Sequence, residues 1–220
     1  MKTKHDVRID RSKIHPWLDY KLDLLLKECA KKGIYLIVTE GFRTKEYQDE
    51  LYAKGRTKPG VIVTGAKGKD YSSQHQWGIA FDIAMNYDVD GDGKITDDTW
   101  NEKGFKAVAK IAKSSKVGLA WGGDWRSIID TPHLYLKKWG STTTKLKRKY
   151  GTPDKFKKYW KRRLKKNRYL YTTKGMKKRK YLIKAGEKVT VLWYSRLGYA
   201  KVIHDGNTGY VFRSGFYSVE

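Results

Sequence analysis

The sequence contains little cysteine, little proline and no long apolar run. A single cysteine, Cys29, among 220 residues excludes an internal disulfide and leaves the redox compartment open. No stretch approaches the roughly 20 apolar residues that cross a bilayer, and the first ten residues lack the apolar core of a signal peptide. We therefore expect a protein that is made without a secretion signal and has no membrane span.

Acidic residues are scarce in the last third of the chain. Residues 1–140 hold 25 Lys and Arg against 19 Asp and Glu, a net charge of +6, whereas residues 141–220 hold 23 against 4, a net charge of +19. The tail therefore carries most of the total charge of +25. This distribution predicts a polyanionic partner for the tail: nucleic acid, anionic lipid or an anionic wall polymer.

Hydrophobic periodicity predicts an α+β domain over residues 1–140. Apolar residues at helical spacing predict helices at 16–32 and 101–113, and Thr44 is suited to cap a third helix that ends at Gly55. Short apolar runs predict strands at residues 35–39, 78–85, 117–121 and 132–136. We expect a small antiparallel sheet with flanking helices.

The remainder of the chain divides by composition into two segments, 141–167 and 168–220. Residues 141–167 are predicted to be a basic linker that is partly helical, beginning at Pro153, with apolar residues at helical spacing at Phe156, Tyr159, Trp160 and Leu164. Residues 168–220 alternate short aromatic and β-branched segments with turn signals such as Asp205-Gly. This pattern predicts a small all-β, SH3-like barrel.

Two histidines and two aspartates form the strongest chemical signal. His75 and Asp82 stand seven residues apart across Gly78, and Asp130 precedes His133 by three. Zinc binds imidazole and carboxylate, and a catalytic zinc leaves one position open for water. Two His and one Asp supply three such ligands, and the remaining acid suits transfer of the water's proton to the leaving amine.

The spacing within each pair predicts its local structure. Positions 75 and 82 differ in parity, as do 130 and 133, so neither pair can face one site from a single regular strand. We therefore expect His75 to precede its strand, with Gly78 turning the chain and Asp82 within the strand. Pro132 similarly places Asp130 on a loop, so that His133 opens a strand.

The motifs Ser73-x-His75-x-x-Gly78-x-Ala80-x-Asp82 and Asp130-x-x-His133 resemble those of the zinc D-Ala-D-Ala carboxypeptidase and L-alanyl-D-glutamate peptidase family. The resemblance covers roughly residues 10–140. It includes the Arg segment of the family at Glu40-Gly-Phe-Arg43-Thr44 and a segment of its phage lysin branch at Gly118–Trp125.

The resemblance implies a role for each matching residue. His75, Asp82 and His133 would bind zinc, and Asp130 would act as general base and acid. Arg43 would stabilise the oxyanion of the tetrahedral intermediate, and Ser73 would contact the substrate. Several relatives have Glu in place of Asp130, so the shorter side chain requires its loop to approach the metal more closely.

The same resemblance implies an endolysin that acts on peptidoglycan. The Trp-Gly-Gly-Asp-Trp segment at 121–125 is similar to endopeptidases that cleave between L-Ala and D-Glu of the stem peptide. The alternative on this scaffold is removal of terminal D-Ala as a D-Ala-D-Ala carboxypeptidase. Without a signal peptide, we expect a monomeric phage or prophage enzyme that is made in the bacterial cytoplasm and reaches the wall through a holin-type pore.

An acidic loop six residues after Asp82 resembles a calcium loop of EF-hand type. Its first three carboxylates stand at loop positions 1, 3 and 5, and a glycine stands at position 6. Position 12 carries Thr99 instead of a bidentate Glu, and Asp97 or Asp98 would have to substitute. The predicted ligands are Asp88, Asp90, Asp92, the Lys94 carbonyl, Asp97 and Asp98. A solvated acidic turn is the alternative.

Residues 168–220 resemble a bacterial SH3-type wall-binding module. The resemblance rests on Tyr169–Tyr171, Ala185–Trp193, Gly198–Val202 and Gly209–Phe212. The Lys and Arg runs at 145–149, 155–166 and 177–180 would contact teichoic acid or other wall phosphates, although the run at 155–166 is equally well explained as a solvated linker.

Three other functions compete with this interpretation. A nucleic-acid-binding protein would explain the basic tail but not the His and Asp motifs. A non-catalytic metal-binding domain would need neither Asp130 nor Arg43. A cysteine peptidase would use Cys29, but that residue falls on the apolar face of a predicted helix, where a free cysteine is ordinarily core.

Overall fold

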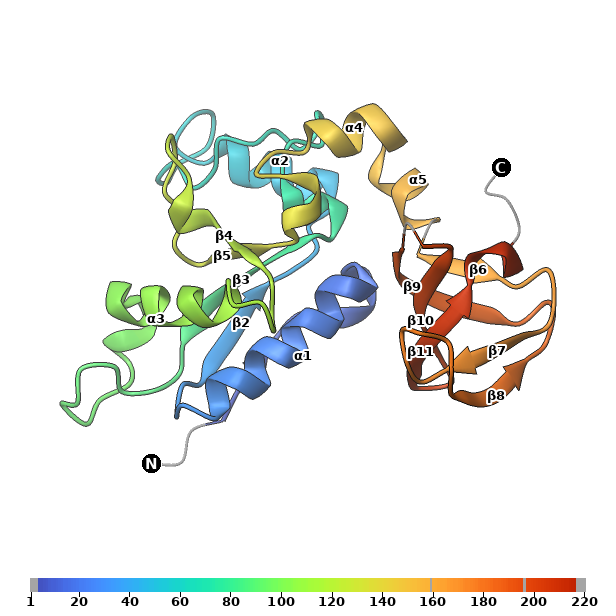
Figure 1. Cartoon of the computed structure of the whole chain (residues 1–220). Helices are drawn as coiled ribbons and strands as arrows, with labels where there is room; N and C mark the ends of the chain where they lie inside the picture. Colours follow the sequence, from blue (N-terminus) through green and yellow to red (C-terminus); the bar gives the residue numbers. More distant parts are fainter. Residues whose placement is uncertain (1–3, 159, 196, 217–220) are drawn as a thin grey trace. The chain divides into compact units, whose positions relative to one another are not determined.

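The computed structural model describes residues 4–158, 160–195 and 197–216. The chain forms two compact units, which we describe separately (Figure 1). The first unit comprises the chain up to Ile14 together with Leu18–Pro153, and the second comprises His15–Trp17 together with the chain from Asp154 onward. The predicted domain boundaries at 140 and 168 stay a prediction.

The first unit is built on a five-stranded sheet with the order β1-β2-β3-β5-β4. All neighbouring pairs are antiparallel except β1 and β2, which pair in parallel. The two-residue β1 was not predicted, so the expected antiparallel sheet is corrected to a mixed one. The strands are β1 Asp6–Val7, β2 Leu36–Glu40, β3 Ala80–Met85, β4 Ala120–Trp121 and β5 His133–Tyr135.

In the described part of the first unit, four α-helices accompany this sheet. Thr44 caps the second of them through a hydrogen bond that its Oγ1 accepts from the Tyr47 amide at 3.1 Å, as its position predicted. The helix at Thr144–Tyr150 was expected only in general terms, as a partly helical linker. The four are α1 Pro16–Ala30, α2 Lys45–Ala53, α3 Glu102–Ala112 and α4 Thr144–Tyr150.

The two faces of the sheet differ because side chains alternate along each strand. Phe81 and Leu134 are opposite each other in β3 and β5, and both are fully buried in the core. Further core side chains come from both helices and strands: Leu18, Leu22, Leu25, Leu36, Val38, Ile83, Met85, Phe105 and Val108. The adjacent pair, Asp82 and His133, therefore points to the other face of the sheet.

The second unit contains a six-stranded sheet with the order β6-β9-β10-β11-β7-β8. The predicted turn at Asp205-Gly206 joins β10 to β11, and both residues have positive φ values, +46° and +70°. No pairing within the described residues joins β8 to β6, so the structure shows a β domain and not a closed barrel. The strands are β6 Lys161–Arg163, β7 Arg168–Tyr171, β8 Arg179–Ile183, β9 Lys188–Tyr194, β10 Tyr199–His204 and β11 Asn207–Phe212.

The helix predicted to run from Pro153 past Leu164 is wrong over most of its length. The helix α5 ends at Lys157, and β6 follows and pairs with β9. Leu164 is fully buried in the core of the second unit, and its amide donates to the Glu187 carbonyl at 3.1 Å. Strand pairing thus overrides the local helical spacing. Tyr159, which belonged to that pattern, lies outside the described residues.

None of the helices in the described ranges is long and apolar enough to cross a membrane.

Candidate metal centre and active site

His75 is held in a short 3-10 helix, Gln74–Trp77, directly before β3. The Ser73 Oγ caps this helix by accepting a hydrogen bond from the His75 amide at 3.3 Å. Gly78 ends the helix with φ +62°, a left-handed conformation that favours glycine. The chain therefore turns between the imidazole and the strand, as the spacing predicted.

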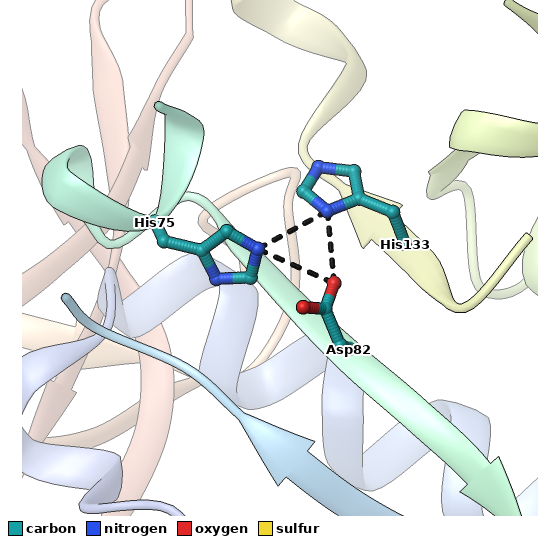
Figure 2. Close-up of side chains that lie close together, drawn as sticks. All are labelled: His75, Asp82 and His133. Carbon is teal, nitrogen blue, oxygen red and sulfur yellow. Dashed lines mark hydrogen bonds and ion pairs between the residues drawn. The ribbon is translucent and has the colours of Figure 1, made fainter. Parts of the chain in front are cut away.

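Asp82 and His133 are direct partners across β3 and β5. The Asp82 Oδ1 lies 2.9 Å from the His133 Nδ1, and Figure 2 shows both side chains pointing toward His75. His133 is the first residue of its strand, which confirms the position expected after Pro132.

The three side chains form a tight triangle. The His75 Nε2 is 3.2 Å from the His133 Nδ1 and 3.2 Å from the Asp82 Oδ1, with 2.9 Å along the third edge. Tetrahedral zinc with bonds of about 2.0 Å separates its ligand atoms by about 3.3 Å. The triangle therefore has nearly the dimensions of one face of a zinc coordination tetrahedron.

Hydrogen bonds on the far side of each ring fix the tautomers. The His75 Nδ1 lies 2.6 Å from the Gly41 carbonyl, which only accepts, so the proton is on Nδ1. The His133 Nε2 lies 2.8 Å from the Gln74 Oε1, and the Gln74 amide nitrogen donates to the Gly140 carbonyl at 2.9 Å, which fixes the amide orientation. Two ring lone pairs and a carboxylate oxygen thus converge with no proton between them, an arrangement that fits a bound cation.

Burial and mutual charge set the protonation of these groups. Burial lowers the pKa of His75 and keeps its ring neutral, the form that binds metal. Burial by itself would raise the pKa of Asp82, but interactions with His75 and His133 outweigh it and hold that pKa well below the ordinary value. These shifts therefore favour a neutral His75 imidazole beside an ionised Asp82 carboxylate.

Arg43 binds the carboxylate oxygen that faces away from the histidines. Its Nη2 donates to the Asp82 Oδ2 at 3.0 Å, its Nη1 donates to Gln48 at 3.4 Å, and its Nε lies 3.4 Å from the Glu40 carboxylate. The guanidinium is thus fixed beside the triangle. This position orients Asp82, and the predicted action of Arg43 on an oxyanion stays a prediction.

Asp130 approaches the triangle from a loop. Its Oδ2 lies 3.9 Å from the His133 Nδ1, and 40% of its side chain is accessible to solvent. A Cβ on Gly122 would meet the Asp130 carbonyl oxygen at 2.5 Å, so this glycine permits the close approach that the short Asp side chain requires. Burial raises the pKa of Asp130.

A cavity of about 900 Å³ opens onto the site. Its lining includes every residue predicted for zinc binding, catalysis or substrate contact: Arg43, Ser73, His75, Asp82, Asp130 and His133. The Ser73 side chain is buried and caps the helix of His75, and its predicted contact with substrate stays a prediction.

The acidic loop brings together only part of its predicted ligand set. Carboxylate oxygens of Asp88, Asp90 and Asp98 lie within 4.8 Å of one another. Asp98 is buried, and its Oδ2 accepts hydrogen bonds from the amides of Val89 and Asp90. Asp92 and Asp97 do not belong to this group, and the Asp92 Oδ2 lies 3.5 Å from the Lys94 Nζ.

Comparisons with known proteins identify the first unit. A family profile described as D-alanyl-D-alanine carboxypeptidase matches residues 66–136. The peptidoglycan L-alanyl-D-glutamate endopeptidase CwlK of Bacillus subtilis (strain 168) is 42% identical over 136 residues, which are 57% of this chain and 74% of CwlK. The chain belongs to the D-alanyl-D-alanine carboxypeptidase family of metallopeptidases.

Other similar proteins share less sequence identity with this chain. The L-alanyl-D-glutamate peptidase of Listeria phage A118 is 34% identical over 125 residues, which are 54% of this chain and 37% of that peptidase. Among solved structures, the L-Ala D-Glu endopeptidase ChiX of Serratia marcescens is 21% identical to this chain, with a TM-score of 0.41. The aligned region covers 58% of this chain and 83% of ChiX. The D,D-pentapeptidase VanY, solved in complex with Zn(II), is also 21% identical, with a TM-score of 0.39. Its aligned region covers 56% of this chain and 72% of VanY.

The match to the family profile contains the whole triangle and Asp130. Arg43 precedes the matched range, and both segments of the second unit lie outside it. The profile match therefore includes most of the predicted site residues that converge in the cavity.

Two residues of this metallopeptidase site were missed in the sequence. Gln74 adjoins His75, but its contact with His133 depends on a pairing 59 residues away. Tyr135 stands two residues after His133, and the period-two alternation of a strand was the available signal that both face the cavity.

Proposed function

We propose that this metallopeptidase holds zinc and cleaves the bond between L-Ala and D-Glu in the stem peptides of peptidoglycan. The observation that carries the proposal is the convergence of three proton-free ligand atoms from His75, Asp82 and His133. The choice of bond is supported by the similarity to CwlK, a protein named for that activity.

The side chains around the cavity would have separate roles in this reaction. His75, Asp82 and His133 would hold the zinc, which supplies Lewis acidity and activates water when bound. Asp130 would take a proton from the attacking water and pass it to the leaving amine. The raised pKa of its carboxyl group favours this uptake and release of a proton. Arg43 would keep Asp82 in place, and its fixed charge would favour developing negative charge in the cavity.

A second candidate is a carboxypeptidase that releases terminal D-Ala. The description of the matching family profile favours it. Both candidates use the same zinc centre and differ in which part of the stem peptide enters the cavity.

Mass spectrometry of fragments from digested peptidoglycan separates the two candidates. The proposal predicts stem fragments with a new N-terminal D-Glu or D-isoglutamine, whereas release of free D-Ala supports the carboxypeptidase. If neither product forms with zinc present, both proposals are wrong.

Gln74 provides a further test of the metal centre. Gln74→Met removes the acceptor for the His133 Nε2–H, and we expect zinc affinity to fall about 10–100-fold because ring orientation is lost. Gln74→Glu keeps an acceptor at that position and should retain most of the affinity. Competition with a chromogenic chelator measures both variants, and equal affinity of the Met variant and the wild type would exclude this role.

We further propose that the second unit, with the basic linker, binds the cell wall. The proposed domains are a zinc peptidase at 1–140, a linker at 141–167 and an SH3-type module at 168–220. Support comes from the charge of +19 over residues 141–220 and from the exposed side chains of Lys177, Lys178 and Lys180. These cations suit the phosphates of teichoic acid.

Salt-dependent pull-down on purified walls tests this binding. Replacing Lys177, Lys178 and Lys180 together by Gln should weaken retention and reduce its salt dependence. The matched control replaces three exposed lysines of α3, Lys103, Lys106 and Lys110, and should leave retention unchanged. Tight binding to DNA without binding to walls would instead favour the nucleic-acid alternative.

Calcium in the acidic loop is a separate proposal. The grouped oxygens of Asp88, Asp90 and Asp98 support it, and the loop lies close in sequence to the zinc ligand Asp82. We propose that calcium orders this loop and thereby β3. Calcium-selective chelation at saturating zinc should then lower the thermal midpoint and the activity, and no change in either would exclude it.

The site of action follows from the substrate. We propose that the enzyme acts on the bacterial cell wall as a phage or prophage endolysin released through a holin-type pore, in line with its similarity to the Listeria phage A118 peptidase. To test this route, the protein is expressed inside bacteria with and without a holin, and lysis of the culture is measured. The proposal predicts lysis only when the holin is present.

A further inference from the structure

Tyr135 shares the sheet face that carries the metal ligands. It follows His133 by two residues in β5, so both side chains point the same way. Its direct partners in the neighbouring strands are Ala80 in β3 and Ala120 in β4. These small side chains leave room for the phenol ring above the sheet, and the ring centroid lies 5.7 Å from that of His133.

Among the described residues, the Tyr135 hydroxyl has one hydrogen-bond partner, the Trp125 indole, and that partner is a donor. The Trp125 Nε1 lies 3.1 Å from the hydroxyl oxygen, and an indole N–H can only donate. The tyrosine oxygen must therefore accept, which leaves its own hydrogen to be donated elsewhere. Within the described part of the chain, no acceptor for this hydrogen is found, although the residue is only 7% exposed and lines the cavity.

Arg43, which also lines the cavity, already has hydrogen-bond acceptors for two of its three nitrogens. Arg43 directs its Nη2 to Asp82 and its Nη1 to Gln48. A donor that serves the reacting carbonyl has to be oriented before substrate arrives and has to lack a competing acceptor. Tyr135 meets both conditions, because Trp125 fixes its oxygen and nothing described takes its hydrogen.

We propose that Tyr135 is a catalytic residue whose hydroxyl donates a hydrogen bond to the scissile carbonyl oxygen as negative charge develops there. The inference rests on the proposed peptidase function. No proton is transferred in this role: the hydroxyl keeps its hydrogen, and the bond strengthens as the carbonyl oxygen becomes anionic.

Tyr135→Phe removes only the hydroxyl and tests the assignment. We expect kcat/KM on a stem-peptide substrate to fall about 10²–10³-fold, mainly through kcat, as for loss of one oxyanion donor. Affinity for a phosphinate analogue of the L-Ala–D-Glu bond should fall in parallel, because the phosphinate oxygen mimics the oxyanion. Zinc affinity and the thermal midpoint should match those of the wild type, and Tyr35→Phe, outside the cavity lining, serves as the control.

A double-mutant cycle with Trp125→Phe distinguishes orientation from packing. If Trp125 acts by orienting the hydroxyl, Trp125→Phe alone lowers kcat/KM, and adding it to Tyr135→Phe lowers it no further. The proposal is overturned by unchanged kcat/KM and phosphinate affinity in Tyr135→Phe, by additive losses in the cycle, or by an equal loss of zinc affinity. A wild-type enzyme that releases no new N-terminal D-Glu would instead contradict the proposed function, independently of Tyr135.

Discussion

Replacing His133 by Ala is expected to abolish peptidoglycan digestion and to weaken zinc binding by more than about 100-fold. This loss of zinc affinity exceeds the one expected for Gln74→Met, because Gln74 only orients the His133 ring. The reason is the triangle: without the His133 Nδ1, only one imidazole and one carboxylate remain, and Asp82 loses its partner at 2.9 Å. Metal analysis after gel filtration and a digestion assay at saturating zinc measure the two effects.

Thermal unfolding supplies a third measurement of the same change. Zinc should raise the thermal midpoint of the wild type, since a ligand that binds only the folded state stabilises it by mass action, and this rise should disappear in His133→Ala. His204→Ala is the control, because His204 is also buried and lies 3.1 Å from a carboxylate, that of Glu187, but belongs to the second unit. A zinc content equal to that of the wild type in His133→Ala would show that His133 is not a ligand.

Replacing Asp130 by Asn is expected to lower kcat/KM about 10²–10⁴-fold while leaving zinc affinity unchanged. The amide has nearly the same shape but cannot take up a proton, and the Asp130 Oδ2 is 3.9 Å from the His133 Nδ1, outside the 2.9–3.2 Å triangle. Steady-state kinetics together with chelator competition separate proton transfer from metal binding.

Asp124→Asn is the matched control for this substitution. Asp124 also lines the cavity, but its carboxylate is paired with the Lys113 Nζ at 2.9 Å, so we expect near wild-type rates. Loss of zinc in Asp130→Asn would make Asp130 a fourth ligand, and full activity would exclude it from catalysis.

Local signals in the sequence were sufficient for the elements that frame the site. The helix predicted at 101–113 is α3, because its apolar side chains recur at helical spacing and Asn101 caps it. Parity along the strands predicted that His75 would precede β3 and that His133 would open β5, and both predictions are confirmed. The alternation of side chains along a strand gives this result once both residues of a pair are required to face one site.

Features that depend on contacts between residues far apart in the chain could not be predicted from the sequence. Gln74 reaches His133 only because β3 and β5 are neighbours, and β1 exists only because two residues near the N-terminus pair with β2. Leu164 continued a helical pattern but entered the core of the second unit through strand pairing. For Leu164, strand pairing outweighs a local helical preference that is worth less than about 1 kcal/mol per residue.

The order of strands in the first unit has a consequence for how the protein folds. The strand β5, the last of the sheet in sequence, lies between β3 and β4, and β5 is the one partner of β4 among the described strands. The same strand brings His133 into contact with Asp82 and His75, which lie 51 and 58 residues earlier in the chain. We expect insertion of β5 to complete the sheet and create the ion site in one slow, late event, since long-range pairing closes large loops. Zinc uptake during refolding, followed with a fluorescent chelator, should therefore never precede hydrogen-exchange protection of β3 and β4, and a growing chain that ends before residue 133 should capture no ion at this site.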